Sequence, residues 1–207
     1  YTLEPEIFSF GLLNDFTDYL KKSEIEHYPV HLKIDTGMHR LGFMVDEIDG
    51  LCKKLKQNPF IKVKSVFSHL VASEDPGEDG FTILQASLLK ERGVNREKAL
   101  DYSFDKHIDN TSGISRHPDL QMNMVRLGIG LYGIDSNVKM QKNLKNVSTL
   151  TTTISQVKKI KKGETVGYGR NAKVKKDSII AVARIGYADG YSRKLGNGNG
   201  KMLVKNK

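Results

Sequence analysis

Residues 30–35 read Val30-His31-Leu32-Lys33-Ile34-Asp35, a short β-favouring run that ends in charged side chains. Similar runs recur at Val63–Phe67, Phe104–Ile108 and Asn123–Arg126, and we predict a strand at each of them, as at Val30–Ile34. Helical patterns separate the runs, which is typical of βα units around a parallel sheet. The sequence therefore predicts an α/β fold for the first part of the chain.

Three helices are predicted from apolar residues that recur at steps of three and four, the period of one helix face. These residues are Leu12, Leu13, Phe16 and Leu20 in the first segment, Ile48, Leu51, Cys52 and Leu55 in the second, and Phe81, Leu84 and Leu88 in the third. We expect each face to pack against the sheet, with the first helix preceding the first strand.

The composition changes after Gly133. Residues 147–160 are rich in Thr, Val and Ile, residues 161–164 predict a turn, and residues 178–185 form another β-favouring run. No amphipathic helical pattern follows in the sequence. We therefore expect an α/β domain over 1–138 and the beginning of a mostly β domain over 139–207.

Each predicted strand of the first domain runs into polar or glycine residues at its C-terminal end. The groups are Lys33, Asp35 and Arg40; Ser68 and His69; Asp109, Asn110 and Thr111; and Arg126, Gly128 and Gly130. In α/β barrels the loops at this end of the strands converge on one mouth, where active sites are built. Four consecutive strand ends of this kind predict one pocket.

Each of these residues also has a purely structural interpretation. Lys33 can lie at a solvated sheet edge, His69 can be a hydrogen-bonded core histidine, and Arg126 can pair with a surface carboxylate. Thr111 can simply cap a helix. Their clustering at neighbouring strand ends favours the site interpretation.

Two segments of the first domain are suited to binding a phosphate. Thr111-Ser112-Gly113 begins a predicted helix, whose first backbone amides can meet an anion. Arg126-Leu127-Gly128-Ile129-Gly130 offers a second, glycine-lined approach. With cations beside both segments, the sequence suggests a phosphorylated cofactor.

A tyrosine between glycines follows the last β-favouring run, in the stretch Ile185-Gly186-Tyr187-Ala188-Asp189-Gly190-Tyr191. One interpretation is a tight turn with an exposed aromatic ring. The other is a phenol presented as an acid or base, which requires a nearby cation to lower its proton affinity. Spacing alone leaves both interpretations open.

The composition restricts the class of partner. The formal net charge is +9, but the lysines are spread out, and the densest run, 158–162, lacks the interleaved aromatics that stack on bases, so we expect no nucleic-acid partner. Cys52 is the only cysteine of the sequence, which excludes a disulfide-stapled secreted domain, and we predict no metal site. The sequence shows no bilayer-length apolar run and no signal-peptide pattern, so we expect a cytoplasmic location and no membrane partner.

These residues carry a resemblance to the alanine racemase family, whose members are fold-type III pyridoxal-phosphate enzymes. The first block is His31-Leu32-Lys33-Ile34-Asp35-Thr36-Gly37-Met38-His39-Arg40-Leu41-Gly42, with His39 where the family commonly has glycine. Four further blocks follow in the family's order, at Ser68-His69, His107–Thr111, Met124–Gly133 and Gly186–Gly190. The resemblance covers nearly the whole chain. It implies part of a (β/α)8 TIM-type barrel, followed by the start of a mostly β C-terminal domain.

The resemblance also implies roles for residues of the pocket. Lys33 matches a lysine that is commonly carbamylated and then holds the neighbouring arginine. Arg40 matches that arginine, which contacts the cofactor and the substrate carboxylate, and His69 matches the histidine paired with the catalytic tyrosine. Arg126 matches the arginine that faces the pyridine nitrogen. Because arginine stays protonated, that nitrogen is left unprotonated, which favours brief carbanion formation over transamination.

The cofactor's phosphate is implied to meet Asn110, Thr111, Gly128 and Ile129. Thr111 stands where the family usually has serine, so the hydroxyl is kept. Asp109 stands where a small residue is usual, and an extra carboxylate near a phosphate departs from the family's pattern.

Tyr187 matches the tyrosine that removes or returns the α-proton on one face of the substrate, while a Schiff-base lysine serves the other face. In the family that lysine lies on the first barrel strand, upstream of the residues given. We therefore expect an internal fragment that is inactive by itself. Some bacterial members are fused behind a cell-wall peptide ligase, and the sequence leaves that arrangement open.

The resemblance implies an enzyme that uses pyridoxal 5'-phosphate to interconvert L-alanine and D-alanine for peptidoglycan synthesis. It also implies a homodimer in which Tyr187 completes the partner's site. Two other functions stay open at this stage. One is a racemase for another amino acid, because side-chain specificity depends partly on segments outside the chain. The other is a non-catalytic pyridoxal-phosphate barrel protein, although such proteins lack a β domain of the kind predicted over 147–204.

Overall fold

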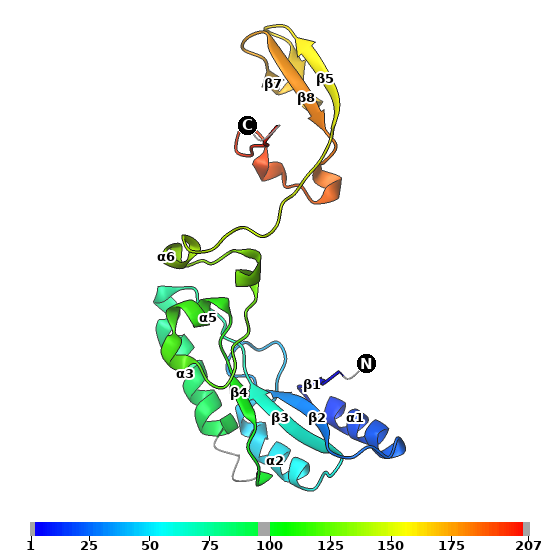
Figure 1. Ribbon diagram of the computed structural model, residues 1–207, viewed down its shortest axis with the longest axis vertical. Helices are drawn as coiled ribbons and strands as arrows, with labels where there is room; N and C mark the ends of the chain where they lie inside the picture. The colour runs from blue at the N-terminus through cyan, green and yellow to red at the C-terminus, as the bar shows by residue number, and fades with distance from the viewer. Residues whose placement is uncertain (1–2, 95–99, 205–207) are drawn as a thin grey trace. The chain divides into compact units, whose positions relative to one another are not determined.

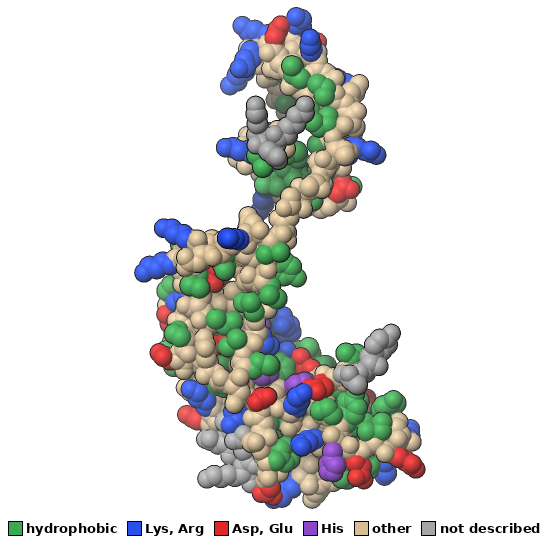
Figure 2. Space-filling view, viewed as in Figure 1, with side chains coloured by type: hydrophobic (Ala, Val, Ile, Leu, Met, Phe, Trp, Pro, Cys, Tyr) green, Lys and Arg blue, Asp and Glu red, His purple; other side chains and the backbone are tan. Residues whose placement is uncertain are grey.

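The computed structural model describes residues 3–94 and 100–204, which fall into two compact units, unit 1 (1–148) and unit 2 (149–207). Among the described residues, no helix is both long and apolar enough to cross a membrane. Lys and Arg side chains lie scattered over the face in view (Figure 2). The domain boundary expected after residue 138 stays a prediction.

Unit 1 is built on a sheet of four parallel strands in the order β1-β2-β3-β4 (Figure 1). The strands are β1 (Glu6–Ile7), β2 (Tyr28–Lys33), β3 (Ile61–Phe67) and β4 (Asp105–His107). The α-helices are α1 (Phe10–Lys22), α2 (Ile48–Lys56), α3 (Asp79–Leu88), α5 (Thr111–Arg116) and α6 (Val138–Gln141). Shorter helical turns are η1 (Val45–Glu47), η2 (Pro76–Glu78), η3 (Leu89–Val94), η4 (Pro118–Leu120) and η5 (Ile129–Tyr132). The predicted parallel α/β class is confirmed.

One hydrophobic core lies between the sheet and its helices. It includes Leu13 and Leu20 of α1, Ile48, Leu51 and Leu55 of α2, and the strand residues Val30, Leu32, Val63 and Val66. Helix α1 begins after Ser9, whose hydroxyl accepts a hydrogen bond from the amide of Leu12 over 3.3 Å. The apolar periodicity of α1 and α2 thus predicted the faces that pack.

The apolar face predicted for α3 is wrong. Leu84 is 50% exposed, and Gln85 is fully buried in its place. The Gln85 amide accepts from the backbone N–H of Val71 and donates to the carbonyl of His69 and to Thr36 Oγ1, over 3.0, 3.1 and 3.3 Å. Buried loop groups need partners, so a glutamine fills a position that periodicity would give to an apolar residue.

The strand predicted at Asn123–Arg126 is also wrong. This segment runs beside β4, and Asn123 N donates to Lys106 O over 3.1 Å while Arg126 N donates to Asp109 O over 3.0 Å. No strand is assigned there among the described residues, because a ladder requires regularly repeated bonds.

Unit 2 consists of two small antiparallel ribbons. β5 (Ile154–Ile160) pairs with β8 (Ser178–Ala183), and β6 (Thr165–Val166) pairs with β7 (Ala172–Lys173). Helical turns η6 (Tyr168–Arg170), η7 (Tyr187–Asp189) and η8 (Arg193–Leu195) complete it. The predicted turn at 161–164 is present, with Glu164 N donating to Lys161 O over 3.1 Å, but it leads into β6 rather than directly to the partner of β5. No described residue of unit 2 is buried.

Candidate functional site

The predicted site residues of unit 1 lie at one edge of its sheet. Lys33 ends β2, His69 follows β3 by two residues, and Thr111 follows β4 by four. Because β2, β3 and β4 are adjacent and parallel, their C-terminal ends meet at the same edge. The structure therefore brings these three strand ends together, as the sequence predicted.

Arg126 makes hydrogen bonds to several residues at this edge. Its guanidinium donates from Nη2 to the carbonyl oxygens of Ser68, at 2.7 Å, and Ile108, at 3.2 Å, and from Nη1 to His107 Nδ1. The guanidinium carbon lies 5.1 Å from the centre of the Phe67 ring. Burial lowers the pKa of Arg126, but an arginine keeps its proton at any physiological pH. The arginine is thus a fixed donor fork that joins the ends of β3 and β4.

His69 is half-buried beside this fork. Its Nδ1 lies 3.3 Å from Arg126 Nη2. Burial lowers the pKa of the His69 ring, and the positive charges of Arg126 and Arg40 lower it further. The ring is therefore neutral near pH 7. Because Arg126 can only donate, Nδ1 must accept, and the ring hydrogen lies on Nε2.

His107 accepts a hydrogen bond from Arg126 through its Nδ1. The sequence did not predict it as a site residue. It is 3% exposed, and its ring stacks on Phe67 with 4.7 Å between centroids. Burial lowers the pKa of His107 to about 4, with a further contribution from the charge of Arg126. Its place at the end of a predicted strand was visible in the sequence, but its partner was not.

The loop after β2 carries Arg40. Asp35 holds the loop, because its buried carboxylate accepts from the amides of Gly37, at 2.8 Å, and His39, at 3.1 Å. Burial raises the pKa of Asp35, but these hydrogen bonds outweigh it, and the net pKa is lowered. Arg40 itself is exposed, so the structure places it near enough to act on His69 through its charge without burying it.

Lys33 is the last residue of β2. Its Nζ lies 3.1 Å from Glu6 Oε1 of β1 and 5.7 Å from the centre of the Phe67 ring. The lysine is buried, so the alternative of a solvated edge lysine is wrong. Carbamylation of Lys33 stays a prediction.

Thr111 gathers the glycine segment around its hydroxyl. Thr111 Oγ1 accepts from Gly128 N at 3.0 Å and from Gly130 N at 3.1 Å. A Cβ on Gly130 would lie 2.8 Å from Leu127 and 2.9 Å from Thr111, so this close approach requires glycine. Ile129 stands between the two glycines and is 54% exposed. The two segments predicted to bind phosphate are therefore adjacent.

Asn110 serves as the N-cap of α5. Its Oδ1 accepts from Gly113 N at 2.9 Å and from Ser73 Oγ at 2.8 Å, and its Nδ2 donates to Leu70 O at 3.4 Å. The structure thus gives Asn110 a capping role, and its predicted contact with a phosphate stays a prediction.

Asp109 is fully buried at the same strand end. Neither of its carboxylate oxygens has a hydrogen-bond partner among the described residues. Burial raises the pKa of Asp109, although the charges of His117 and Arg126 oppose the change. The shift favours the neutral acid, which reduces the repulsion between this carboxyl group and a nearby anion.

Tyr187 lies in unit 2, on a turn held by Asp189, whose Oδ2 accepts from Gly186 N over 2.8 Å. Gly190 ends the turn with φ +85°. Tyr187 is 68% exposed, and the guanidinium carbon of Arg193 lies 4.2 Å from the centre of its ring. The turn therefore presents the phenol to solvent next to a cation.

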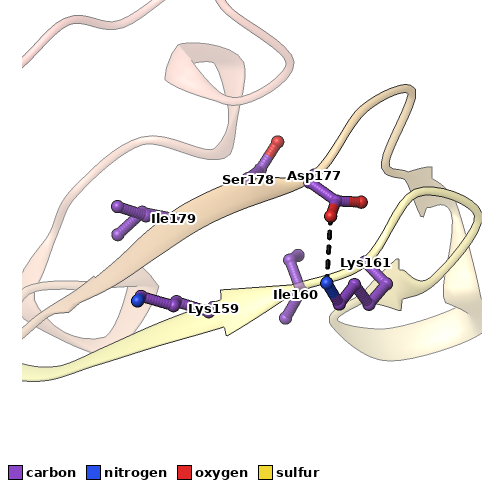
Figure 3. A pocket seen from close by; sticks show the side chains of 6 residues that line it. All are labelled: Lys159, Ile160, Lys161, Asp177, Ser178 and Ile179. Atoms are coloured by element: carbon purple, nitrogen blue, oxygen red, sulfur yellow. Dashed lines mark hydrogen bonds and ion pairs between the residues drawn. The ribbon is translucent and has the colours of Figure 1, made fainter.

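Unit 2 also has a surface pocket, which is formed by other residues than those predicted for the site. It is lined by Lys159, Ile160, Lys161, Asp177, Ser178 and Ile179 (Figure 3). Lys161 Nζ lies 3.1 Å from Asp177 Oδ2, and the two side chains are 81% and 65% exposed. Such an exposed pair contributes little energy, and the pocket contains none of the predicted site residues.

The donor set of unit 1 suits an anionic ligand. The described residues contain no cluster of three or more His, Cys, Asp or Glu side chains that could hold a metal. Arg126, Arg40 and Lys33 all act electrostatically on His69, so three cations surround the strand ends. With the Thr111 hydroxyl beside two glycines, these residues fit a phosphorylated cofactor.

Comparison with known proteins identifies the family. The sequence profile "Alanine racemase, N-terminal domain" matches residues 1–136, and "Alanine racemase, C-terminal domain" matches residues 147–207. The chain belongs to the alanine racemase family. It is 36% identical to the alanine racemase of Clostridium tetani over 217 residues, which cover 99% of this chain and 54% of that protein. It is 35% identical to alanine racemase 1 of Bacillus subtilis, over 97% of this chain and 50% of that protein.

Solved alanine racemase structures share its fold. The alanine racemase of Clostridium difficile 630 aligns with a TM-score of 0.78 and 27% identity, over 92% of this chain and 50% of that one. The alanine racemase of Streptomyces lavendulae aligns with a TM-score of 0.84 and 23% identity, over 98% of this chain and 54% of that one. These neighbours confirm the predicted partial TIM-type barrel followed by a β domain. The chain spans about half the length of the alanine racemases that it matches.

Proposed function

We propose that the protein that carries this racemase-family chain interconverts L-alanine and D-alanine with pyridoxal 5'-phosphate. The observation that carries the proposal is the placement of the Arg126 guanidinium, which bonds His69 at the same strand edge where Thr111 gathers two glycines. The cations Arg126, Arg40 and Lys33 near this edge can pair with the phosphate of the cofactor and the carboxylate of the substrate. A solved relative, the alanine racemase of Bartonella henselae, is described with covalently bound pyridoxal phosphate, at 26% identity and a TM-score of 0.71.

In this proposal Asn110, Thr111, Gly128 and Ile129 would hold the phosphate group, and Arg126 would hold the pyridine side. When bound, pyridoxal phosphate supplies an electron-withdrawing ring that makes the α-proton of an amino acid acidic. Arg126 stays protonated and can only donate, so it favours an unprotonated ring nitrogen. With the cofactor bound, Arg126 would thereby favour return of the proton over transamination.

The chain's own acid/base groups are Tyr187 and His69. We assign Tyr187 Oη the removal or return of the α-proton on one face of the substrate. His69 keeps its hydrogen on Nε2 because its Nδ1 accepts from Arg126, and Nε2–H can donate to the tyrosine oxygen. Arg40, on its Asp35-held loop, orients the substrate carboxylate, and Lys33, if carbamylated, would hold Arg40.

The same proposal extends to the biology of the complete protein. D-alanine is a building block of peptidoglycan, so we propose a cytoplasmic enzyme of cell-wall synthesis. We also propose a homodimer in which Tyr187 of one protomer serves the site of its partner, and a Schiff-base lysine upstream of this chain as the second base.

The proposal is tested with the complete protein, reconstituted with pyridoxal phosphate and assayed for conversion of each alanine enantiomer. Tyr187→Phe is expected to lose most turnover while the cofactor's absorbance is retained. Tyr191→Phe, which removes a hydroxyl four residues away in the same segment, is the matched control and should keep activity. Absence of racemisation in the wild type would overturn the proposed function. Full activity of Tyr187→Phe would overturn the role of the phenol alone.

A further inference from the structure

A continuous row of polar side chains leads from Arg126 across the sheet to its first strand. His107 Nδ1 meets Arg126 Nη1, and His107 Nε2 lies 3.1 Å from Ser65 Oγ. Ser65 Oγ lies 2.6 Å from His31 Nδ1, and His31 Nε2 lies 2.9 Å from Glu4 Oε2. The row crosses β4, β3 and β2 and ends just before β1.

The register of the sheet makes this row possible. Val30 is opposite Val63, but the next pair is His31 opposite Ser65, because the pairing of β2 and β3 shifts by one residue. An unshifted register would place Lys64 opposite His31 instead. With the shift, Ser65 lies between the two histidines, and it is 1% exposed.

Arg126 fixes the hydrogen positions at one end of the row. A guanidinium has no acceptor, so His107 Nδ1 must accept from it. His107 is neutral because burial holds its pKa at about 4, so its single ring hydrogen lies on Nε2. His107 therefore donates to Ser65.

Glu4 fixes the other end independently. A hydrogen bond from Lys64, whose Nζ lies 2.6 Å from Glu4 Oε1, lowers the pKa of the Glu4 carboxyl group. The carboxylate can only accept, so His31 Nε2 carries a hydrogen and donates to it. Ser65 accepts from His107, so its own hydroxyl hydrogen is left to donate, and His31 Nδ1 at 2.6 Å is the acceptor.

The two ends thus require the same direction, and every donor in the row points from Arg126 toward Glu4. We propose that Ser65, His31 and Glu4 are positioning residues that, through this one-directional row, hold His107 in its Nε2–H form beneath Arg126. The part of this inference that concerns catalysis rests on the proposed function. None of the three residues is among those that we propose to hold substrate or cofactor, so in this proposal they act only through His107 and Arg126.

The row is tested by nitrogen-15 NMR of histidine-labelled complete protein without alanine or pyridoxal phosphate. His107→Gln identifies the His107 signals. In the wild type, His107 should show a protonated Nε2 and an unprotonated Nδ1, with slow exchange of the Nε2 hydrogen. Ser65→Ala removes the acceptor of that hydrogen and should accelerate its exchange with water roughly tenfold or more.

A second pair of variants changes a partly exposed position, where folding is not at risk. Glu4→Leu removes the terminal acceptor, so His31 should lose its single tautomer. Glu4→Gln keeps an oxygen acceptor and should restore it. His27→Asn is the control, because His27 is an exposed histidine outside the row whose positive φ suits asparagine. His27→Asn should change the nitrogen-15 signals of neither His107 nor His31.

Turnover supplies the second readout. Ser65→Ala and Glu4→Leu should lower kcat for alanine by roughly tenfold while KM changes little, and Glu4→Gln should recover it. A wild-type His107 protonated on Nδ1, or unchanged His107 and His31 signals in Ser65→Ala and Glu4→Leu, would overturn the row. Because the NMR signals are read without ligand, an inactive wild type would overturn the proposed function and leave the row standing.

Discussion

Arg126 Nη2 donates to the carbonyl oxygen of Ser68 over 2.7 Å, and the same nitrogen reaches the carbonyl of Ile108 over 3.2 Å. One planar group therefore joins the ends of two neighbouring strands while its other branch meets His107. A lysine offers a single nitrogen on a flexible stem and cannot make these bonds together.

We therefore expect Arg126→Lys to lower the free energy of unfolding by about 2 kcal/mol, because buried carbonyl oxygens lose their donors. Racemisation by the complete protein should also be lost. Arg116→Lys is the control, since Arg116 bonds Ser73 O at 2.6 Å and Asp79 Oδ1 at 2.8 Å, away from the hydrogen bonds that join Arg126 to His69 and His107. Urea unfolding should show a similar loss for both variants, and an equal loss of activity in both would contradict the role given to Arg126.

Asp109→Asn should stabilise the protein more at pH 8 than at pH 4. The pKa of Asp109 is raised in the folded state, so stability falls as pH rises above the unfolded value, and the penalty is complete above the folded pKa. Asparagine removes the charge and hence the penalty. Asp105→Asn removes the same charge from an exposed position of β4. If the difference between Asp109→Asn and the wild type were the same at both pH values, burial of the carboxylate would not be costly.

Gly42→Ala should destabilise the loop that carries Arg40. Gly42 has φ +135°, and a Cβ there would lie 2.6 Å from the backbone nitrogen of Asp35. We expect a loss of about 3 kcal/mol or more, since the strand end must move. Gly50→Ala in α2 is the matched change, where the nearest atom would lie 3.9 Å away, and it should stabilise by about 0.5 to 1 kcal/mol. Thermal unfolding of the two variants measures the contrast, and similar effects would contradict it.

Gln85→Leu should cost about 2 to 4 kcal/mol although it makes the core more apolar, because Val71 N, His69 O and Thr36 Oγ1 lose a partner. Leu84→Gln, at the exposed neighbour, should cost less than about 0.5 kcal/mol. Chemical unfolding compares the two. A larger effect at Leu84 would restore the helix face predicted from periodicity.

The sequence was most informative where local pattern and burial agree. The strand around Leu32 and the helix around Leu51 were predicted because both place apolar residues at the period of their element. β1 was missed, since the two residues Glu6 and Ile7 carry no period and pair only because β2 lies beside them. The segment at 123–126 looked like a strand from composition, but ladder formation depends on a neighbour that the sequence does not reveal.

The sequence predicted that several polar residues lie at one edge of the sheet, but it did not predict their hydrogen bonds. Lys33, His69 and Thr111 were placed together because polar residues at the ends of adjacent parallel strands share an edge. Arg126 lies at the same edge although the strand predicted before it is absent. His107 was not predicted, because its importance comes from Arg126, nineteen positions later in the chain. Contacts of this kind depend on strand register, which periodicity does not determine.

The one-residue register shift after Val30 has an evolutionary consequence. Because of this shift, the side chains at positions 4, 31, 65 and 107 are joined by hydrogen bonds. We therefore expect substitutions at these four positions to occur in a particular order as lineages diverge. Loss of His31 leaves the hydroxyl hydrogen of Ser65 without an acceptor, and selection would then favour a compensating change at Ser65 before His107 is free to vary. An ancestral reconstruction of the family should therefore show the histidine at 107 as the last of the four to be replaced.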